Sequence, residues 1–191
     1  MKLPRFIFQT AGLFLGTAAL AMLAGCVTQS QTRPLPTVKK ADLRRYSGQW
    51  YEIARLKNRF QREGESAMAE YKLLSETSAS VHNTATTPSG KVRSIEGTAT
   101  VVPGSNGARL RVKFHGLAAL VPASSEGNYW IIALDPGYRS AMVGTPDRKY
   151  LWILSREPRL SEATKKAYLK QAESLGFSLQ DLVWDPRPAA R

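Results

Sequence analysis

The chain has 191 residues, and its 27 Lys and Arg against 15 Asp and Glu give a formal net charge of +12 at pH 7. This length is sufficient for one domain that buries its own apolar core. Cys26 is the single cysteine, which excludes an intrachain disulfide. The positive charge favours acidic partners.

The first 25 residues have the pattern of an export signal. Lys2 and Arg5 precede an almost wholly apolar stretch, residues 6–23, and Leu23-Ala24-Gly25-Cys26 ends it. This ending resembles the lipobox of bacterial lipoproteins, which implies cleavage before Cys26 and lipidation of that cysteine. We therefore expect a cleaved lipoprotein signal peptide at 1–25. The alternatives are an uncleaved transmembrane anchor and an ordinary secretory signal.

Export also bears on the acidic partner. An exported chain rarely meets nucleic acid, and the basic residues do not form one block, so no nucleic-acid partner is expected. We interpret the basic residues as a solvated surface. The more specific alternative is that this surface contacts anionic phospholipid or lipopolysaccharide head groups.

Residues 26–42 carry the lipidated cysteine and a polar stretch with Pro34 and Pro36. The stretch shows no periodicity that could bury a face, which predicts a flexible tether. Residues 43–191 then form the single folded domain.

Within the domain, short segments rich in β-forming residues alternate with Gly, Pro, Asn, Ser or Asp. In residues 109–115, Leu110, Val112 and Phe114 share one face, and basic or imidazole side chains share the other. Eight such strands joined mostly by tight turns predict an all-β fold, an eight-stranded up-and-down antiparallel barrel. The expected strands are 50–56, 67–74, 80–86, 92–102, 108–115, 129–134, 139–144 and 150–155.

One helix is expected after the strands. Ser161 is a candidate N-cap, apolar residues then recur at helical spacing, and Gly176 supplies the stop. The apolar stripe predicts that this C-terminal helix packs on the outside of the barrel. Residues 177–184 could add a short strand.

Three short motifs resemble those of the lipocalin family. Gly48 and Trp50 match the first motif, Asp135 and Tyr138 the second, and Arg156 the third, in the same order and at similar distances. One departure is Leu134-Asp135-Pro136-Gly137-Tyr138, which stands where many lipocalins have a T-D-Y run. With the lipobox, these motifs resemble the bacterial, apolipoprotein D-like lipocalins over residues 42–184.

The resemblance implies a lipocalin calyx in which the motif residues are structural. Trp50 is expected to plug the closed end, with the Arg156 guanidinium stacked over its indole. Placing the Arg156 side chain inside the barrel sets the parity of its strand, that is, which alternate residues face inward, and alternation sets the parity of the other strands. The inward positions expected to bind ligand are Ala69, Tyr71, Ile95, Ala99, Leu110, Val112, Phe114, Tyr129, Ile131, Tyr150 and Trp152.

This lining suits a fatty acid such as palmitate, a lysophospholipid or a similar amphiphile. The resemblance implies that the chain binds such lipids, and stores or transports them in the cell envelope. Lipidated Cys26 would attach it to the outer membrane, because Val27 is not the aspartate that favours inner-membrane retention in the lipoprotein class. A homodimer is compatible with the sequence.

Catalysis is not expected. His82 and His115 lie on different segments, and neither metal-binding spacings nor a nucleophile motif occurs. We predict no catalytic residue, no metal site and no cofactor. The alternatives are an envelope interaction or structural lipoprotein with a closed barrel that acts through its surface, and a small-substrate enzyme.

Overall fold

The computed structural model describes residues 33–116 and 124–187. The chain divides into two units, residues 1–31 and 32–191. The expected signal peptide and Cys26 lie outside the described residues. Every helix and strand that the structure describes belongs to the second unit.

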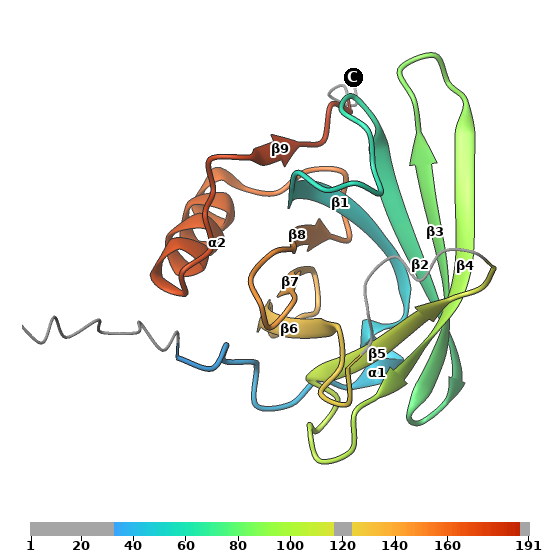
Figure 1. The fold of residues 1–191 in the computed structure, drawn as a ribbon, viewed down its shortest axis with the longest axis vertical. Helices are drawn as coiled ribbons and strands as arrows, with labels where there is room; N and C mark the ends of the chain where they lie inside the picture. Colours follow the sequence, from blue (N-terminus) through green and yellow to red (C-terminus); the bar gives the residue numbers. More distant parts are fainter. Residues whose placement is uncertain (1–32, 117–123, 188–191) are drawn as a thin grey trace, which may run out of the picture. The chain divides into compact units, whose positions relative to one another are not determined.

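Eight antiparallel strands close into a barrel (Figure 1). Each strand pairs with the next along the chain, and β1 also pairs with β8, so the sheet has no free edge between them. The barrel predicted from the sequence is confirmed. Its strands are β1 (Gly48–Leu56), β2 (Ser66–Ser75), β3 (Ser78–Thr86), β4 (Val92–Val101), β5 (Arg109–Phe114), β6 (Tyr129–Leu134), β7 (Ser140–Gly144) and β8 (Leu151–Ser155).

Alternation along the strands separates an inner core from an outer one. On β5, Leu110 and Val112 are buried inside the barrel, as predicted. On β8, Leu154 belongs to the inner core, whereas Ile153 belongs to the outer core. Strands β6 to β8 are therefore buried on both faces, and their apolar residues run almost without interruption.

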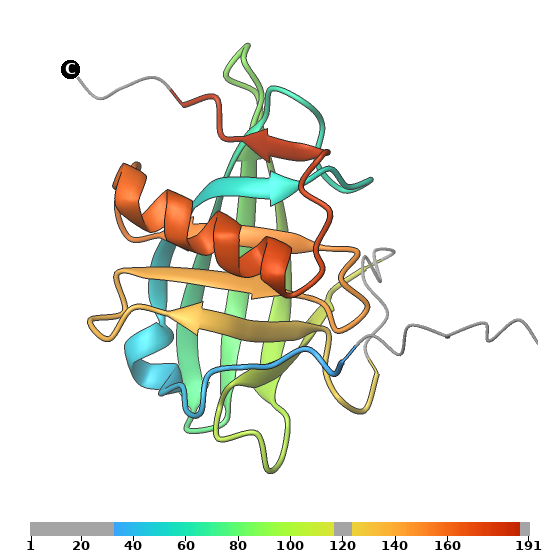
Figure 2. The ribbon, with the colours of Figure 1, turned by 90° about the vertical axis from the view of Figure 1, so that its left-hand side faces the viewer.

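The second helix covers the outer core. α2 (Glu162–Ser174) lies across the outer face of the barrel (Figure 2), where Tyr168 and Ala172 are buried. Ser161 caps it by accepting a hydrogen bond from the Thr164 amide at 3.2 Å, and Gly176 follows it with a φ of +86°. The expected helix is confirmed. Within the described ranges, no helix is long and apolar enough to cross a membrane.

The expected strand in 177–184 forms as β9 (Leu182–Trp184), which pairs with β1. A one-turn helix that the sequence patterns did not predict, α1 (Leu43–Tyr46), precedes β1. The Asp42 carboxylate caps it by accepting hydrogen bonds from the amides of Arg44 and Arg45.

The segment before α1 corrects the expectation of a tether reaching residue 42. Leu35 and Ala41 are buried, the Val38 amide donates to the Ile131 carbonyl, and the Ala41 amide donates to the Asn106 carbonyl, both at 2.9 Å. Residues 35–42 are therefore packed along the barrel. Pro34 and Pro36 are exposed, whereas the apolar side chains of Leu35, Val38 and Ala41 pack against the barrel.

Candidate functional site

One end of the barrel is closed by Trp50, which has no exposed surface. The Arg156 guanidinium carbon lies 3.8 Å from the centre of the indole, the arrangement that the resemblance implies. This guanidinium also donates to the carbonyl oxygens of Gln49, Arg45, Tyr46, Ser47 and Tyr138 at 2.7–3.2 Å. One side chain thus joins α1, the start of β1 and the turn after β6.

Glycine is required at position 48 by the closeness of Arg156. Gly48 has a φ of +97°, and a Cβ there would lie 3.2 Å from the Arg156 Nη1. A side chain at position 48 would be strained and would crowd the guanidinium.

The turn between β6 and β7 completes the closed end. The Asp135 carboxylate accepts hydrogen bonds from the Gly137 and Arg139 amides and pairs with the Arg139 guanidinium at 3.2 Å. The Arg139 hydrogen bond lowers the pKa of Asp135 despite partial burial. Tyr138 adopts a φ of +59°, and its hydroxyl accepts from the Asp42 amide at 2.8 Å. The proline-glycine departure in this motif is thus accommodated in a tightly bonded turn.

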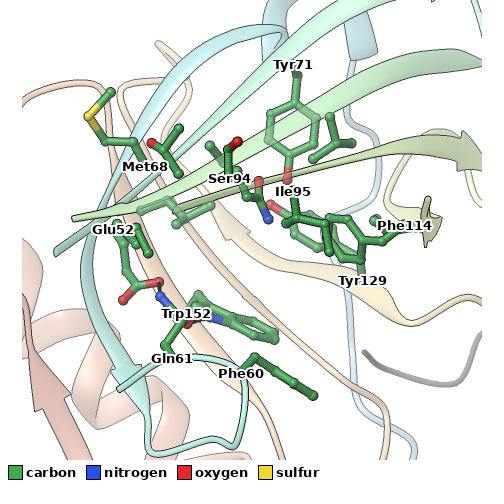
Figure 3. Close-up of a pocket in the computed structure, with 18 of the residues that line it drawn as sticks. Glu52, Phe60, Gln61, Met68, Tyr71, Ser94, Ile95, Phe114, Tyr129 and Trp152 are labelled. Carbon is green, nitrogen blue, oxygen red and sulfur yellow. Dashed lines mark hydrogen bonds between the residues drawn. The ribbon is translucent and has the colours of Figure 1, made fainter. Parts of the chain in front are cut away.

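A cavity of about 370 Å³ occupies the other part of the barrel. It extends to the end formed by the loop after β1 and the β3–β4 hairpin, which we call the mouth. In Figure 3, Tyr71, Ile95, Phe114 and Tyr129 gather on one side of the cavity, with Phe60 and Trp152 on another. Seven predicted ligand-binding positions line it: Ala69, Tyr71, Ile95, Val112, Phe114, Tyr129 and Trp152.

The other four predicted positions do not line the cavity. Ala99, Leu110 and Ile131 point inward, but they belong to the packed core near the closed end. Tyr150 lies at the mouth, where its ring is 5.2 Å from that of Phe60 and 5.9 Å from that of Trp152. The predicted parity is therefore right for these strands, but parity does not tell how deep the cavity reaches.

Tyr46 sets this depth. It is fully buried within the barrel, its ring is 4.8 Å from Trp50 and 5.6 Å from Tyr71, and its hydroxyl lies 2.7 Å from that of Tyr129. Burial raises the pKa of Tyr71 to about 12, and burial likewise raises the pKa values of Tyr46 and Tyr129 well above the usual value. The floor of the cavity is therefore a neutral aromatic cluster.

Sequence reasoning missed the polar part of the cavity. Glu52 lines it although it is almost fully buried, and Figure 3 shows it beside Gln61. Its carboxylate accepts from Arg55 and from Gln61, both at 2.9 Å. Burial raises the pKa of Glu52, while the hydrogen bonds from Gln61 and Arg55 oppose this rise. Glu52 stands two residues after Trp50, so the same strand parity could have found it.

Arg93, on β4, brings a second charge to the cavity wall. Its side chain is 41% exposed, and one guanidinium nitrogen donates to both oxygens of the buried Glu65, at 2.6 and 2.8 Å. Burial would raise the pKa of Glu65, but the Arg62 amide and the Arg93 guanidinium outweigh that effect and lower it. The buried carboxylate therefore holds a guanidinium at the solvent boundary.

Further lining residues were not in the predicted set: Phe60, Ala67, Met68, Val81, Asn83, Thr84, Ala85, Ser94, Asn128, Val143 and Leu154. Phe60 and Gln61 come from the loop after β1, where alternation gives no signal. The Asn83 Oδ1 is buried and accepts no hydrogen bond from the described part of the chain. In the same part, no group of three or more His, Cys, Asp or Glu could hold a metal ion.

Comparisons with known proteins agree with this geometry. Residues 41–187 match a family model described as a lipocalin-like domain. The chain is 37% identical to the outer membrane lipoprotein Blc of Escherichia coli K12 over 175 residues, which cover 91% of this chain and 94% of that protein. It is 33% identical to apolipoprotein D of Rattus norvegicus over 167 residues, 79% of this chain and 83% of the relative.

A solved structure shows the same fold. Insecticyanin from the tobacco hornworm Manduca sexta superposes with a TM-score of 0.58 at 22% identity, covering 81% of this chain and 85% of that one. At this identity the likeness concerns the fold alone.

Proposed function

Because this chain belongs to the lipocalin family, we propose that it binds a single-chain amphiphile, a fatty acid or a lysophospholipid, and stores or transports it in the cell envelope. The observation that carries the proposal is the cavity of about 370 Å³, which has an aromatic floor and polar groups near its mouth. A hydrocarbon tail matches the floor, and a polar head group matches the mouth.

Hydrophobic transfer supplies the affinity. Each buried methylene contributes about 0.8 kcal/mol, so a sixteen-carbon tail could gain on the order of 10 kcal/mol before the costs of ordering it. The walls that would receive it include Val112, Phe114 and Leu154, together with Trp152 on the opposite side. Binding in the micromolar range or tighter follows.

Polar groups near the mouth suit a head group. The partly exposed Arg93 guanidinium could pair with a carboxylate or a phosphate, since arginine donates in a planar fork. The unbonded Asn83 Oδ1 could accept from a ligand hydroxyl. A buried amide oxygen without a partner costs free energy, so a ligand that donates to it gains by relieving that cost.

We also propose that residues 1–25 are removed and that lipids on Cys26 attach the protein to the outer membrane. The lipobox pattern at 23–26 supports this. The name of the Escherichia coli relative, an outer membrane lipoprotein, supports it as well. Two or more acyl chains would hold the protein firmly on a bilayer.

The cavity is tested with the unlipidated domain, residues 28–191, expressed in bacteria and purified without detergent. Denaturing extraction and mass spectrometry should find one fatty acid or lysophospholipid per protein. Val112→Glu places a carboxylate in the cavity wall and should abolish retention, whereas Lys113→Glu adds the same side chain on the exposed face and should not.

A second cavity variant distinguishes loss of lipid binding from misfolding. Trp152→Ala removes a large half-buried side chain from the cavity wall, and its fold is checked by circular dichroism. Absence of retained lipid, together with absence of uptake of added palmitate or lysophosphatidylethanolamine, would favour the envelope interaction protein with a functionally closed barrel.

A further inference from the structure

The N-terminal segment leaves the barrel at the mouth. Figure 2 shows the described part of this segment running from α1, at the closed end, alongside β6 and away from α1. Hydrogen bonds hold it along the way, from Ala41 to Asn106 and from Val38 to Ile131. At its outer end, the Arg33 carbonyl accepts a hydrogen bond from the guanidinium of Arg148.

Arg148 ties this end of the segment to the turn between β7 and β8. Arg148 stands at the same end of the barrel as the loop after β1, and its guanidinium also donates to the Leu175 and Pro146 carbonyls. Tyr150, two residues later, packs against Phe60 and Trp152, which both line the cavity. The last described residue before the anchor therefore lies beside the mouth.

The remaining length of chain limits where a bilayer can lie. Six residues lie between Cys26 and Arg33, and the seven Cα-to-Cα steps of this stretch reach only about 25 Å even when fully extended. The segment from Arg33 to Asp42, at the closed end, has ten residues, and its nine Cα-to-Cα steps would span about 30 Å if extended. A bilayer against the closed end would require a tether that is almost fully extended and runs back along the whole barrel, whereas a bilayer at the mouth requires neither.

The two rim loops have side chains that suit an anionic lipid surface. Residues 57–65 and 145–150 contain more basic than acidic side chains. The five basic residues are Lys57, Arg59, Arg62, Arg148 and Lys149, and the three acidic residues are Glu63, Glu65 and Asp147. Phe60 and Tyr150 are half-buried between them, and the Arg59 guanidinium lies 5.4 Å from the Phe60 ring. Basic and aromatic side chains together are typical of the membrane interface.

From the exit point, the reach and the rim, we infer that the mouth of the barrel faces the bilayer that holds the lipid anchor. This inference rests on the proposed lipidation of Cys26. It gives the cavity a direct route to its ligand, because an amphiphile can pass between the leaflet and the barrel without crossing bulk water. The docking surface is then the rim, and its partner is a phospholipid surface that carries anionic head groups.

The test uses the full lipidated protein in vesicles of phosphatidylethanolamine and phosphatidylglycerol that carry a nitroxide-labelled head group. Since lipidation blocks Cys26, one introduced cysteine carries an environment-sensitive fluorophore. Arg59→Cys labels the rim, Glu76→Cys labels the closed end and Lys166→Cys labels the outer face of α2, all at exposed positions. We expect strong quenching at position 59, weak quenching at 166 and none at 76.

A longer tether provides the matched control. Inserting about 20 Gly and Ser residues after Gln31 removes the limit on reach, so the difference between positions 59 and 76 should shrink. Equal quenching at all three positions with the native tether, or strongest quenching at 166 or 76, would overturn the inference.

Two further measurements separate this inference from the proposed function. Mass spectrometry of the reconstituted protein reports the lipids on Cys26, and an unlipidated Cys26 would overturn the anchor and the orientation together. Lipid retention by the soluble domain tests the cavity alone, so a wrong orientation leaves that result intact.

Discussion

Arg156→Ala should destabilise the domain strongly without changing the cavity. The guanidinium lies 3.8 Å from the Trp50 ring centre and donates to five backbone carbonyls. A partly desolvated cation–π contact contributes about 1–2 kcal/mol, and each hydrogen bond adds about 0.5–1 kcal/mol net. Since Arg156 is partly exposed and water can replace some of these bonds, we expect a loss of about 3 kcal/mol.

Urea unfolding of the soluble domain, followed by far-ultraviolet circular dichroism, measures this loss. Arg159→Ala is the matched control, because Arg159 is exposed three residues further on, and it should change the free energy of unfolding by less than about 0.5 kcal/mol. Arg156→Lys keeps the charge but loses the planar fork, so it should fall between the two. A loss below about 1 kcal/mol for Arg156→Ala would refute the role of this side chain as the clamp of the closed end.

Three further changes test other parts of the structure. Leu35→Ala should lower the free energy of unfolding by about 2–3 kcal/mol in the same urea assay, because Leu35 is buried on the barrel. Lys39→Ala, at an exposed position, should change it by almost nothing. Equal, small effects of the two changes would indicate that this segment is a flexible tether after all. Glu65→Gln should destabilise at pH 7, because the folded-state pKa of Glu65 lies below its unfolded value. The ionised Glu65 stabilises the fold fully above its unfolded-state pKa, about 4.3, and this stabilisation is lost as the pH falls through its folded-state pKa. The unfolding curves of wild type and variant should therefore converge in acid, and a constant difference would contradict the pairing with Arg93. Gly48→Ala should cost about 1–2 kcal/mol in thermal unfolding because of the positive φ at this position, with Ser47→Ala as the neighbouring comparison; an unchanged midpoint would mean that the turn relaxes.

The fold was predictable because its signals are local and repeated. Alternation along residues 109–115 separates inside from outside, and the inward orientation of Arg156 leads to an inward Trp152 on the same strand, where Leu154 also lines the cavity. A strand has only two faces, so one correct orientation determines the rest of that strand. The same reasoning would have placed Glu52 inside, had the parity of Trp50 been continued along β1.

The segment before α1 escaped prediction for a different reason. Leu35, Val38 and Ala41 recur every third residue, a spacing that belongs neither to a strand nor to an α-helix. Their burial depends on the barrel that they meet, which local patterns do not describe. Phe60 and Gln61 belong to the same class, since a loop presents its side chains according to the framework that carries it.

The depth of the cavity was also beyond strand parity, and it bears directly on how an amphiphile would enter. Tyr46 comes from a one-turn helix outside the barrel strands and fills the space that inward residues such as Leu110 would otherwise border. The hydroxyls of Tyr46 and Tyr129 form a hydrogen bond with each other, and both phenols remain neutral because burial raises their pKa values. A charged head group driven to this floor would lose its hydration and meet donors that are already engaged. At the mouth, Arg93 is still partly in water. The proposed ligand should therefore enter tail first, and chain length should be limited by the distance from the mouth to Tyr71 and Tyr129.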